Sequence, residues 1–63
     1  MRLDKTKVEL LRAKKLKSVN ELVEEAGICK PTLNRGYRKD IDPVSVGKIA
    51  KALEVEPEEI IKR

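Results

Sequence analysis

The chain has 63 residues, of which 41% are charged and 40% hydrophobic, and its formal net charge is +4. This length predicts one domain, residues 1–63. With one cysteine and no histidine, we expect no disulfide, metal or cofactor site. A core this small rarely forms a small-molecule pocket or holds catalytic residues, so we do not expect an enzyme. No apolar run reaches the ~20 residues of a membrane span and the N-terminus is not a secretory signal, so we expect a cytoplasmic protein without a membrane partner.

The first predicted helix follows Asp4, a residue type that accepts hydrogen bonds from the free N–H groups at a helix start. Lys14 and Lys15 close this helix at the negative end of its dipole. Leu16 is then expected to enter the core before the next helix begins. The apolar stripe of the first helix consists of Leu3, Val8 and Leu11, with Leu10 beside them.

The second helix is predicted to begin at about Val19. Ser18 and Glu21 stand three positions apart just before an apolar residue, which is the pattern of a reciprocal capping box. Gly27 ends the helix, because glycine adopts the left-handed conformation without a Cβ penalty. The inward positions at helical spacing are Leu22, Val23 and Ala26.

The third helix starts after a sharp turn, with Cys29 as its cap and Pro31 in its first turn, where the missing N–H is not needed. Gly36 is expected to be a left-handed cap, so this helix should stop near Arg35. The exposed positions, basic or amide-bearing apart from one proline, are Lys30, Pro31, Asn34 and Arg35.

The fourth helix is capped by Asp42 and has Pro43 at its first position. Gly47 inside this helix costs up to ~1 kcal/mol relative to alanine, which predicts a close helix contact at that point. A short fifth helix restarts at Glu56-Pro57. The inward faces comprise Val46, Ile49, Ala50 and Leu53 in the fourth helix, with Ile60 and Ile61 in the fifth.

Two segments, ELVEEAGICKPTL and VGKIAKALEVEPEEII, follow a leading helix and are joined by a basic connection. Together they resemble the Cro and phage-repressor type of helix-turn-helix proteins over nearly the whole chain. The resemblance implies an all-α, compact five-helix bundle with a helix-turn-helix, a lambda-repressor-like DNA-binding domain. Gly27 would be its turn glycine, Ile28 and Leu33 its apolar anchors, and residues 30–35 the helix that enters the DNA major groove.

The same resemblance implies a sequence-specific regulator of transcription, a repressor that acts by occupying its operator. Family members often bind palindromes as two-fold dimers, so we expect a homodimer, with the surface near Val55 and Ile61 as the candidate contact. A protein-interaction module on this scaffold, such as an antitoxin or anti-repressor, is the alternative. The discriminating feature is an acid-free segment at residues 29–39, which DNA binding requires and a protein module does not.

Charge is distributed unevenly along the chain. Residues 1–17 carry seven Lys or Arg against two acids, and residues 29–39 carry four cations and no acid. The second helix and residues 54–59 hold most of the glutamates. Such a molecule has a basic side that attracts a duplex and an acidic side that repels it, which orients the encounter with DNA.

Candidate base-reading residues lie on the third helix. Arginine and lysine donate to guanine O6 and N7, asparagine pairs with adenine, and apolar groups pack against the thymine methyl. The candidates are Lys30, Pro31, Thr32, Asn34 and Arg35, with the threonine able to reach a base or a phosphate. Candidate phosphate contacts on the third helix and around it are Lys17, Asn20, Tyr37, Arg38, Lys39 and Lys48.

Plainer alternatives exist for these residues. The cations and Asn20 also fit an ordinary solvated surface. Tyr37 fits either packing over the core in place of the apolar group missing at Gly36 or a hydrogen bond to a phosphate. Cys29 lies beside Lys30 at a helix start, where thiols tend to be acidified. Two roles are therefore open for Cys29: its oxidation blocks DNA binding, or it is a small capping residue in place of serine.

Overall fold

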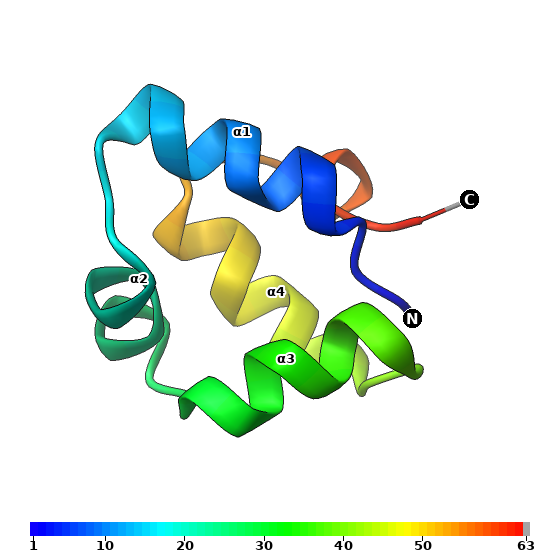
Figure 1. The fold of residues 1–63 in the computed structure, drawn as a ribbon. Helices are drawn as coiled ribbons and strands as arrows, with labels where there is room; N and C mark the ends of the chain where they lie inside the picture. The colour runs from blue at the N-terminus through cyan, green and yellow to red at the C-terminus, as the bar shows by residue number, and fades with distance from the viewer. Residues whose placement is uncertain (63) are drawn as a thin grey trace.

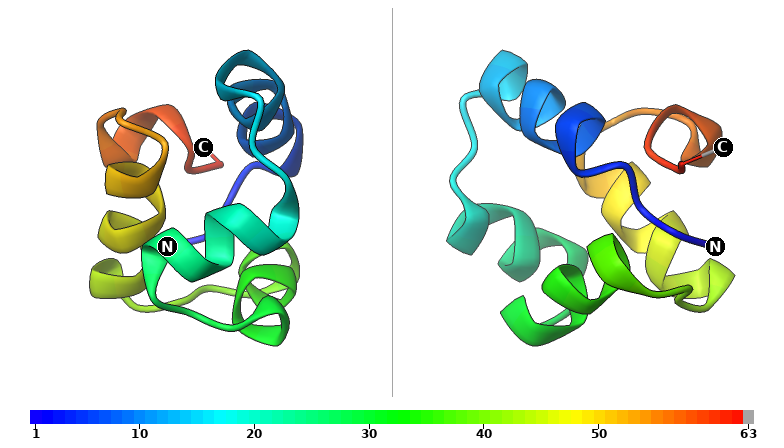
Figure 2. Two further views of the ribbon diagram at one scale, coloured as in Figure 1. Left: turned by 90° about the vertical axis from the view of Figure 1, so that its left-hand side faces the viewer. Right: turned by 45° about the vertical axis from the view of Figure 1, so that its right-hand side comes forward.

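Four α-helices and one short 3₁₀-helix make up residues 1–62, the part of the chain that the computed structural model describes (Figure 1). In chain order they are α1 (Lys5–Lys15), α2 (Val19–Ala26), α3 (Lys30–Arg38), α4 (Pro43–Ala52) and the 3₁₀-helix η1 (Pro57–Glu59). The helix α4 lies between α1 and α3, and α2 lies at one end of the bundle, opposite the two chain ends (Figure 1, Figure 2). Within the described residues, no helix is both long and apolar enough to cross a membrane.

The helices α1, α2 and α4 each start with a local side-chain cap, as predicted. The Ser18 hydroxyl accepts from the Glu21 N–H at 3.1 Å, while the Glu21 carboxylate accepts from the Ser18 N–H at 3.0 Å. This second bond is the main reason that the pKa of Glu21 lies below its ordinary value. Asp4 and Asp42 cap α1 and α4 in the same manner, each accepting a backbone N–H from three residues further on.

The all-α fold is confirmed, but the bundle has four α-helices within residues 1–62, and the predicted fifth α-helix is wrong. The segment after Glu56 makes one 3₁₀ turn and then becomes extended. Residues 60 and 61 pair with the N-terminal segment, and this pairing takes the place of further helical hydrogen bonds. The Asp4 N–H donates to the Ile60 carbonyl at 2.8 Å, and Leu3 and Ile61 form an antiparallel bridge. Ile60 is nevertheless fully buried, as predicted, and Ile61 is partly buried.

Leu16 does not enter the core, so that prediction is wrong as well. Its backbone is left-handed, with φ of 56°, and its side chain is 87% exposed. The N–H groups of Leu16 and Lys17 donate to the carbonyls of Ala13 and Arg12, which closes the last turn of α1. This left-handed closure accompanies an outward-facing Leu16 side chain. Leu10, placed beside the apolar stripe of the first helix, is also 65% exposed.

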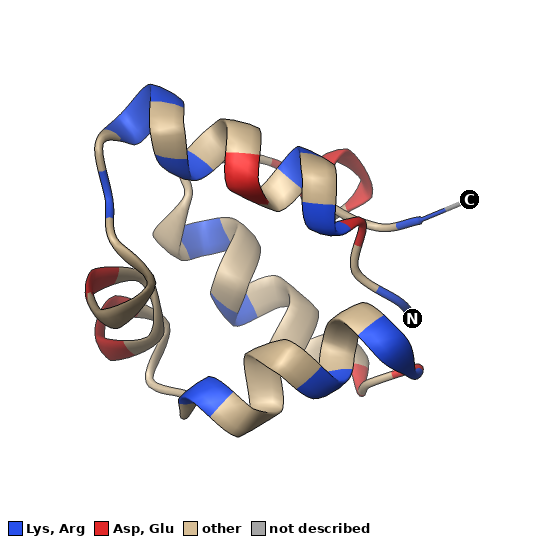
Figure 3. Cartoon of the chain, in the orientation of Figure 1, with Lys and Arg blue, Asp and Glu red and all other residues tan. Residues whose placement is uncertain are grey.

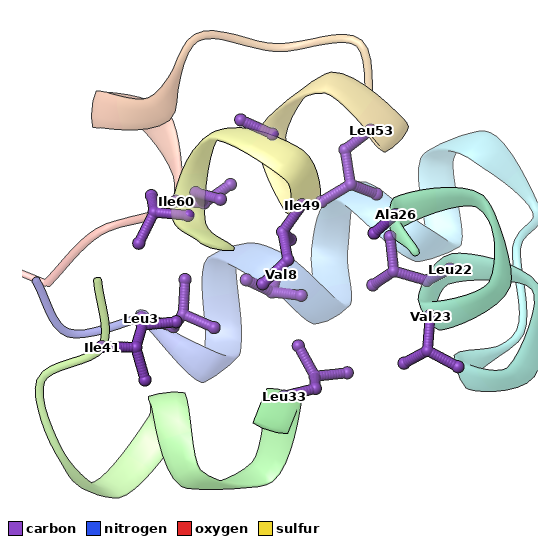
Figure 4. Close-up of a cluster of buried hydrophobic side chains, with 12 residues drawn as sticks. Leu3, Val8, Leu22, Val23, Ala26, Leu33, Ile41, Ile49, Leu53 and Ile60 are labelled. Atoms are coloured by element: carbon purple, nitrogen blue, oxygen red, sulfur yellow. The ribbon is translucent and has the colours of Figure 1, made fainter. Parts of the chain in front are cut away.

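The hydrophobic core surrounds α4 and includes residues from all four α-helices (Figure 4). Because α4 lies in the middle of the bundle, its buried side chains meet residues from α1, α2 and α3 on different sides. No polar or charged residue among residues 1–62 is classed as buried. The core consists of Leu3, Val8, Leu22, Val23, Ala26, Leu33, Ile41, Val46, Ile49, Ala50, Leu53 and Ile60.

Gly36 lies inside α3, so the predicted helix end near Arg35 is wrong. The helix continues to Arg38, and the backbone of Gly36 is not left-handed. Gly36 is buried, and a methyl group added to it would lie 2.7 Å from Leu3 Cδ1 and 3.0 Å from Ile41 Cδ1. The missing side chain leaves a space, here called the Gly36 notch, in which Leu3 packs. The Leu3 N–H also donates to the Gly36 carbonyl at 2.8 Å.

Gly47 in α4 has no close neighbour, so the predicted helix contact there is wrong. No heavy atom outside its own helix backbone and chain neighbours lies within 4 Å of the place where a Cβ would be. Glycine at this position therefore serves no packing purpose that the structure shows.

Replacing Gly47 by alanine is expected to raise the free energy of unfolding by about 0.5–1 kcal/mol, because alanine has the higher helix propensity and the site is open. Urea denaturation followed by circular dichroism measures this change. A loss of stability in Gly47→Ala would mean that α4 packs more closely at this point than the structure shows.

Candidate nucleic-acid interface

The helices α2 and α3 are joined by a short turn, which begins at the left-handed C-cap Gly27 and ends at the N-cap residue Cys29. Gly27 ends α2 with a left-handed backbone, φ 72°, and the Ile28 N–H donates to the Val23 carbonyl at 3.0 Å. Ile28 is partly buried against the core and Leu33 is 1% exposed, which confirms both as apolar anchors. Buried anchors on one face of α3 leave its other face to solvent.

The outward face of α3 carries cations that are not paired within the fold. The ion pairs among residues 1–62 involve the N-terminal amino group, Arg12, Lys15 and Lys17, and none of them uses a cation of α3 or Lys39. An open hollow of about 410 Å³ runs over this face. Its lining brings together residues that were predicted separately as base and phosphate contacts: Pro31, Arg35, Arg38 and Lys39.

The remaining predicted base contacts also lie on α3. Lys30 and Asn34 are exposed, and Thr32 is partly buried. Lys30 stands at the first position of the helix and Pro31 at the second, as the sequence predicts. All five base-contact candidates therefore belong to α3, and the opposite face of this helix packs against the core.

The predicted phosphate contacts fall into two groups in space. Arg38 and Lys39 lie at the end of α3, and Tyr37 borders a hollow together with Asn34. Asn20 is exposed in the first turn of α2. These four residues lie on the helix-turn-helix or directly after it.

Lys17 and Lys48 belong to the other group. The Lys17 ammonium donates to the Glu25 carboxylate at 2.5 Å and to the Ala52 carbonyl at 2.6 Å, and its side chain is 19% exposed. Lys48 borders the same hollow as Lys17, between α2 and α4, and no residue of α3 lines it. Lys17 is thus engaged in joining α2 to α4, and Lys48 lies apart from the face of α3.

Tyr37 is half-buried at the edge of the core. Burial is the main reason that the pKa of its phenol lies above the ordinary value, and the Lys5 ammonium lies 5.9 Å from the centre of its ring. The Gly36 notch beside it is filled by Leu3, so Tyr37 packs next to this space and does not replace the missing side chain.

Sequence reasoning missed two basic residues that lie against α3. Lys5, in the first turn of α1, shares a hollow with Asn34, Tyr37 and Arg38, and the Arg2 guanidinium donates to the Tyr37 carbonyl at 3.2 Å. The sequence shows an excess of cations in residues 1–17, but no pattern among neighbouring residues predicts that this segment lies against α3. Only the smallness of Gly36 hinted that another part of the chain packs there.

Positive and negative charge are distributed unevenly over the helices, with α1 carrying both signs (Figure 3). Lysines and arginines occur along α3 and at both ends of α1, whereas the glutamates gather on α2 and around η1. The acid-free segment at residues 29–39 coincides with α3 and its two flanking residues. A duplex that approaches α3 therefore meets positive charge before it meets the acidic elements.

Cys29 is the N-cap residue of α3, as predicted, but its side chain makes no capping hydrogen bond. Its Sγ lies 3.2 Å from Thr32 Oγ1, and hydrogen bonding from the Thr32 side chain is the main cause that lowers the pKa of the thiol. The thiol is exposed, so a lowered pKa makes it more reactive near neutral pH.

The variant Thr32→Val is expected to slow the alkylation of Cys29, because loss of the hydroxyl raises the thiol pKa and lowers the thiolate fraction. The rate of reaction with iodoacetamide, followed by mass spectrometry across a pH series, tests this. Thr6→Val, an exposed threonine on α1, is the matched control. Equal rates for the two variants would show that Thr32 does not govern the thiol.

Comparison with known proteins bears on this geometry. Residues 8–63 match the family described as the Cro/C1-type helix-turn-helix DNA-binding domain. Searches of curated proteins and of solved structures gave no match. The family match covers α2 and α3, the capped turn between them and most of α1. The chain therefore belongs to the Cro/C1-type helix-turn-helix family of DNA-binding domains, which supports a DNA-binding transcriptional regulator.

Proposed function

We propose that the protein binds duplex DNA sequence-specifically through α3 and represses transcription by occupying its operator. The observation that carries this proposal is the outward face of α3, whose exposed cations make no ion pair within residues 1–62 and which has no acid over residues 29–39. An α-helix fits the major groove, where arginine and lysine donate to guanine and asparagine pairs with adenine.

In this proposal the N-terminal residues of α3 read bases and the residues around it hold the backbone. Lys30 and Arg35 donate to guanine, Asn34 pairs with adenine, and Pro31 and Thr32 pack beside them. Arg38, Lys39, Tyr37 and Asn20 contact phosphates and fix the register without reading sequence. Occupancy of the operator then excludes polymerase from the promoter, and we place the protein in the cytoplasm with its DNA.

A two-fold dimer on a palindromic operator belongs to the same proposal, with half-sites about one helical turn apart. Val55 and Ile61, the predicted contact, are partly buried against the core, whereas Leu10, Leu16 and Val44 are the more exposed apolar side chains. Sedimentation of the protein with and without operator DNA tests the dimer. A single monomer mass, independent of concentration and unchanged on the DNA, would contradict it.

Titration of the ¹⁵N-labelled protein with a short mixed-sequence duplex at low salt tests which face binds. We expect backbone amide shifts to change at residues 30–39 and at Asn20, and to stay unchanged at residues 54–59, because acidic η1 repels the duplex. Changes confined to residues outside α3, or none at all, would contradict the proposal and favour the protein-interaction module.

A further inference from the structure

A hollow between the first turn of α1 and the second half of α3 lies mostly outside residues 30–35, the segment proposed to read bases. It measures about 410 Å³, opens to solvent, and is lined by Lys5, Asn34, Tyr37 and Arg38. One wall therefore comes from a helix that the helix-turn-helix does not include. In Figure 1 these two elements lie on the same side of the bundle as the chain ends, away from α2.

The charges around this hollow are positive and available. Lys5 and Arg38 are exposed, and neither takes part in an ion pair among residues 1–62. The neighbouring acids on α1 are already engaged, since Asp4 caps the helix and Glu9 lies 3.9 Å from Arg12. The Tyr37 ring also lines the hollow, and its centre is 5.9 Å from the Lys5 ammonium.

The N-terminal segment fixes Lys5 in this position. Leu3 packs in the Gly36 notch, and its N–H donates to the Gly36 carbonyl at 2.8 Å. The next residue, Asp4, donates its N–H to the Ile60 carbonyl at 2.8 Å and starts α1. Because backbone hydrogen bonds hold the two residues that precede Lys5, the start of α1 keeps a fixed position beside α3, and Lys5 is presented at the hollow.

We infer that this hollow holds one backbone phosphate of the bound duplex, between the Lys5 ammonium and the Arg38 guanidinium. The inference rests on the proposed function and adds α1 to the DNA-binding surface. A phosphate suits the position because both cations that line the hollow, Lys5 and Arg38, lie outside residues 30–35, the segment proposed to read bases. The phosphate contact extends the footprint beyond the base pairs that α3 reads.

The variant Lys5→Gln tests the inference, because it removes the charge and keeps most of the side chain. Against a duplex enriched from a random library, we expect affinity about 3- to 10-fold weaker than wild type, and a slope of log K against log salt that is reduced by about one contact, with unchanged sequence preference. Lys14→Gln, an exposed lysine at the far end of α1, is the control and should bind as wild type does.

Single methylphosphonate substitutions along the duplex locate the phosphate. At one phosphate the substitution should weaken wild-type binding more than it weakens binding by Lys5→Gln, because the variant retains only the Arg38 contact to that phosphate. If wild type prefers the enriched duplex but Lys5→Gln binds and responds to salt as Lys14→Gln does, the phosphate contact is wrong and the proposed function stands. If wild type shows no preference for any duplex, the proposed function itself fails, and the inference with it.

Discussion

Replacing Gly36 by leucine is expected to destabilise the domain by about 1–3 kcal/mol, the usual cost of forcing extra methylene groups into a packed core. Even the first added carbon would lie 2.7 Å from Leu3 Cδ1, and both Leu3 and Ile41 are buried and have little room to move. Helix propensity acts in the opposite direction, because leucine is favoured over glycine by up to about 1 kcal/mol. The steric conflict is larger, so the net effect is a loss of stability.

A second substitution shows whether Leu3 causes the conflict. Leu3→Ala alone removes a side chain that is 1% exposed and should cost about 2–5 kcal/mol. In the double variant Leu3→Ala, Gly36→Leu, the introduced leucine would occupy space that Leu3 vacates, so the cost should be smaller than the sum of the single costs by at least about 0.5 kcal/mol. Urea denaturation of the four proteins measures the coupling. Additive costs, or a Gly36→Leu variant as stable as wild type, would contradict packing of Leu3 in the Gly36 notch.

The double variant Lys30→Glu, Arg35→Glu is expected to lose DNA binding by about 10²- to 10⁴-fold, since a good base contact contributes roughly 1–3 kcal/mol and each reversal also repels the backbone. Neither cation makes an ion pair within the described chain, so the fold should not change. Lys30→Glu places a negative charge at the positive end of the α3 dipole and stabilises the helix. Arg35→Glu places one nearer the negative end and destabilises it, so the two effects on stability offset each other.

Reversal of the same number of charges elsewhere provides the control. Lys7 and Lys14 are exposed on α1, and neither lines the hollows on α3. Lys7→Glu, Lys14→Glu therefore changes net charge equally and should weaken binding far less. Fluorescence anisotropy with a labelled duplex compares the two double variants, and circular dichroism confirms that both are folded. Equal losses would mean that binding depends on total charge and that α3 has no special role.

Features that depend on a few neighbouring residues were predictable from the sequence. The Ser18 and Glu21 capping box, the left-handed Gly27, and Pro43 after Asp42 are each fixed by contacts within about one helix turn, and all three are confirmed. The position of α3 could also be predicted in this way, because its start depends on the turn after Gly27. Its outward face followed from the buried position of Leu33.

Features that depend on distant parts of the chain were not predictable. Glycine is typical of a helix end, but at Gly36 the packing of Leu3, 33 positions earlier in the sequence, requires a residue without a side chain inside the helix. The same N-terminal segment pairs with Ile61 and ends the last helical turn early. For the site, sequence spacing placed the five base candidates on one helix, but the approach of Lys5 to Tyr37 follows only from this long-range packing.

Selection from a random duplex library at two salt concentrations, repeated with Lys30→Glu, Arg35→Glu, tests the central claim most directly. Sequence-specific recognition through α3 predicts one enriched motif that persists at the higher salt and disappears in the variant, with a two-fold symmetric motif if the protein binds as a dimer. Binding that is indifferent to sequence and lost at the higher salt, or the same motif from wild type and variant, would contradict the claim that α3 reads DNA.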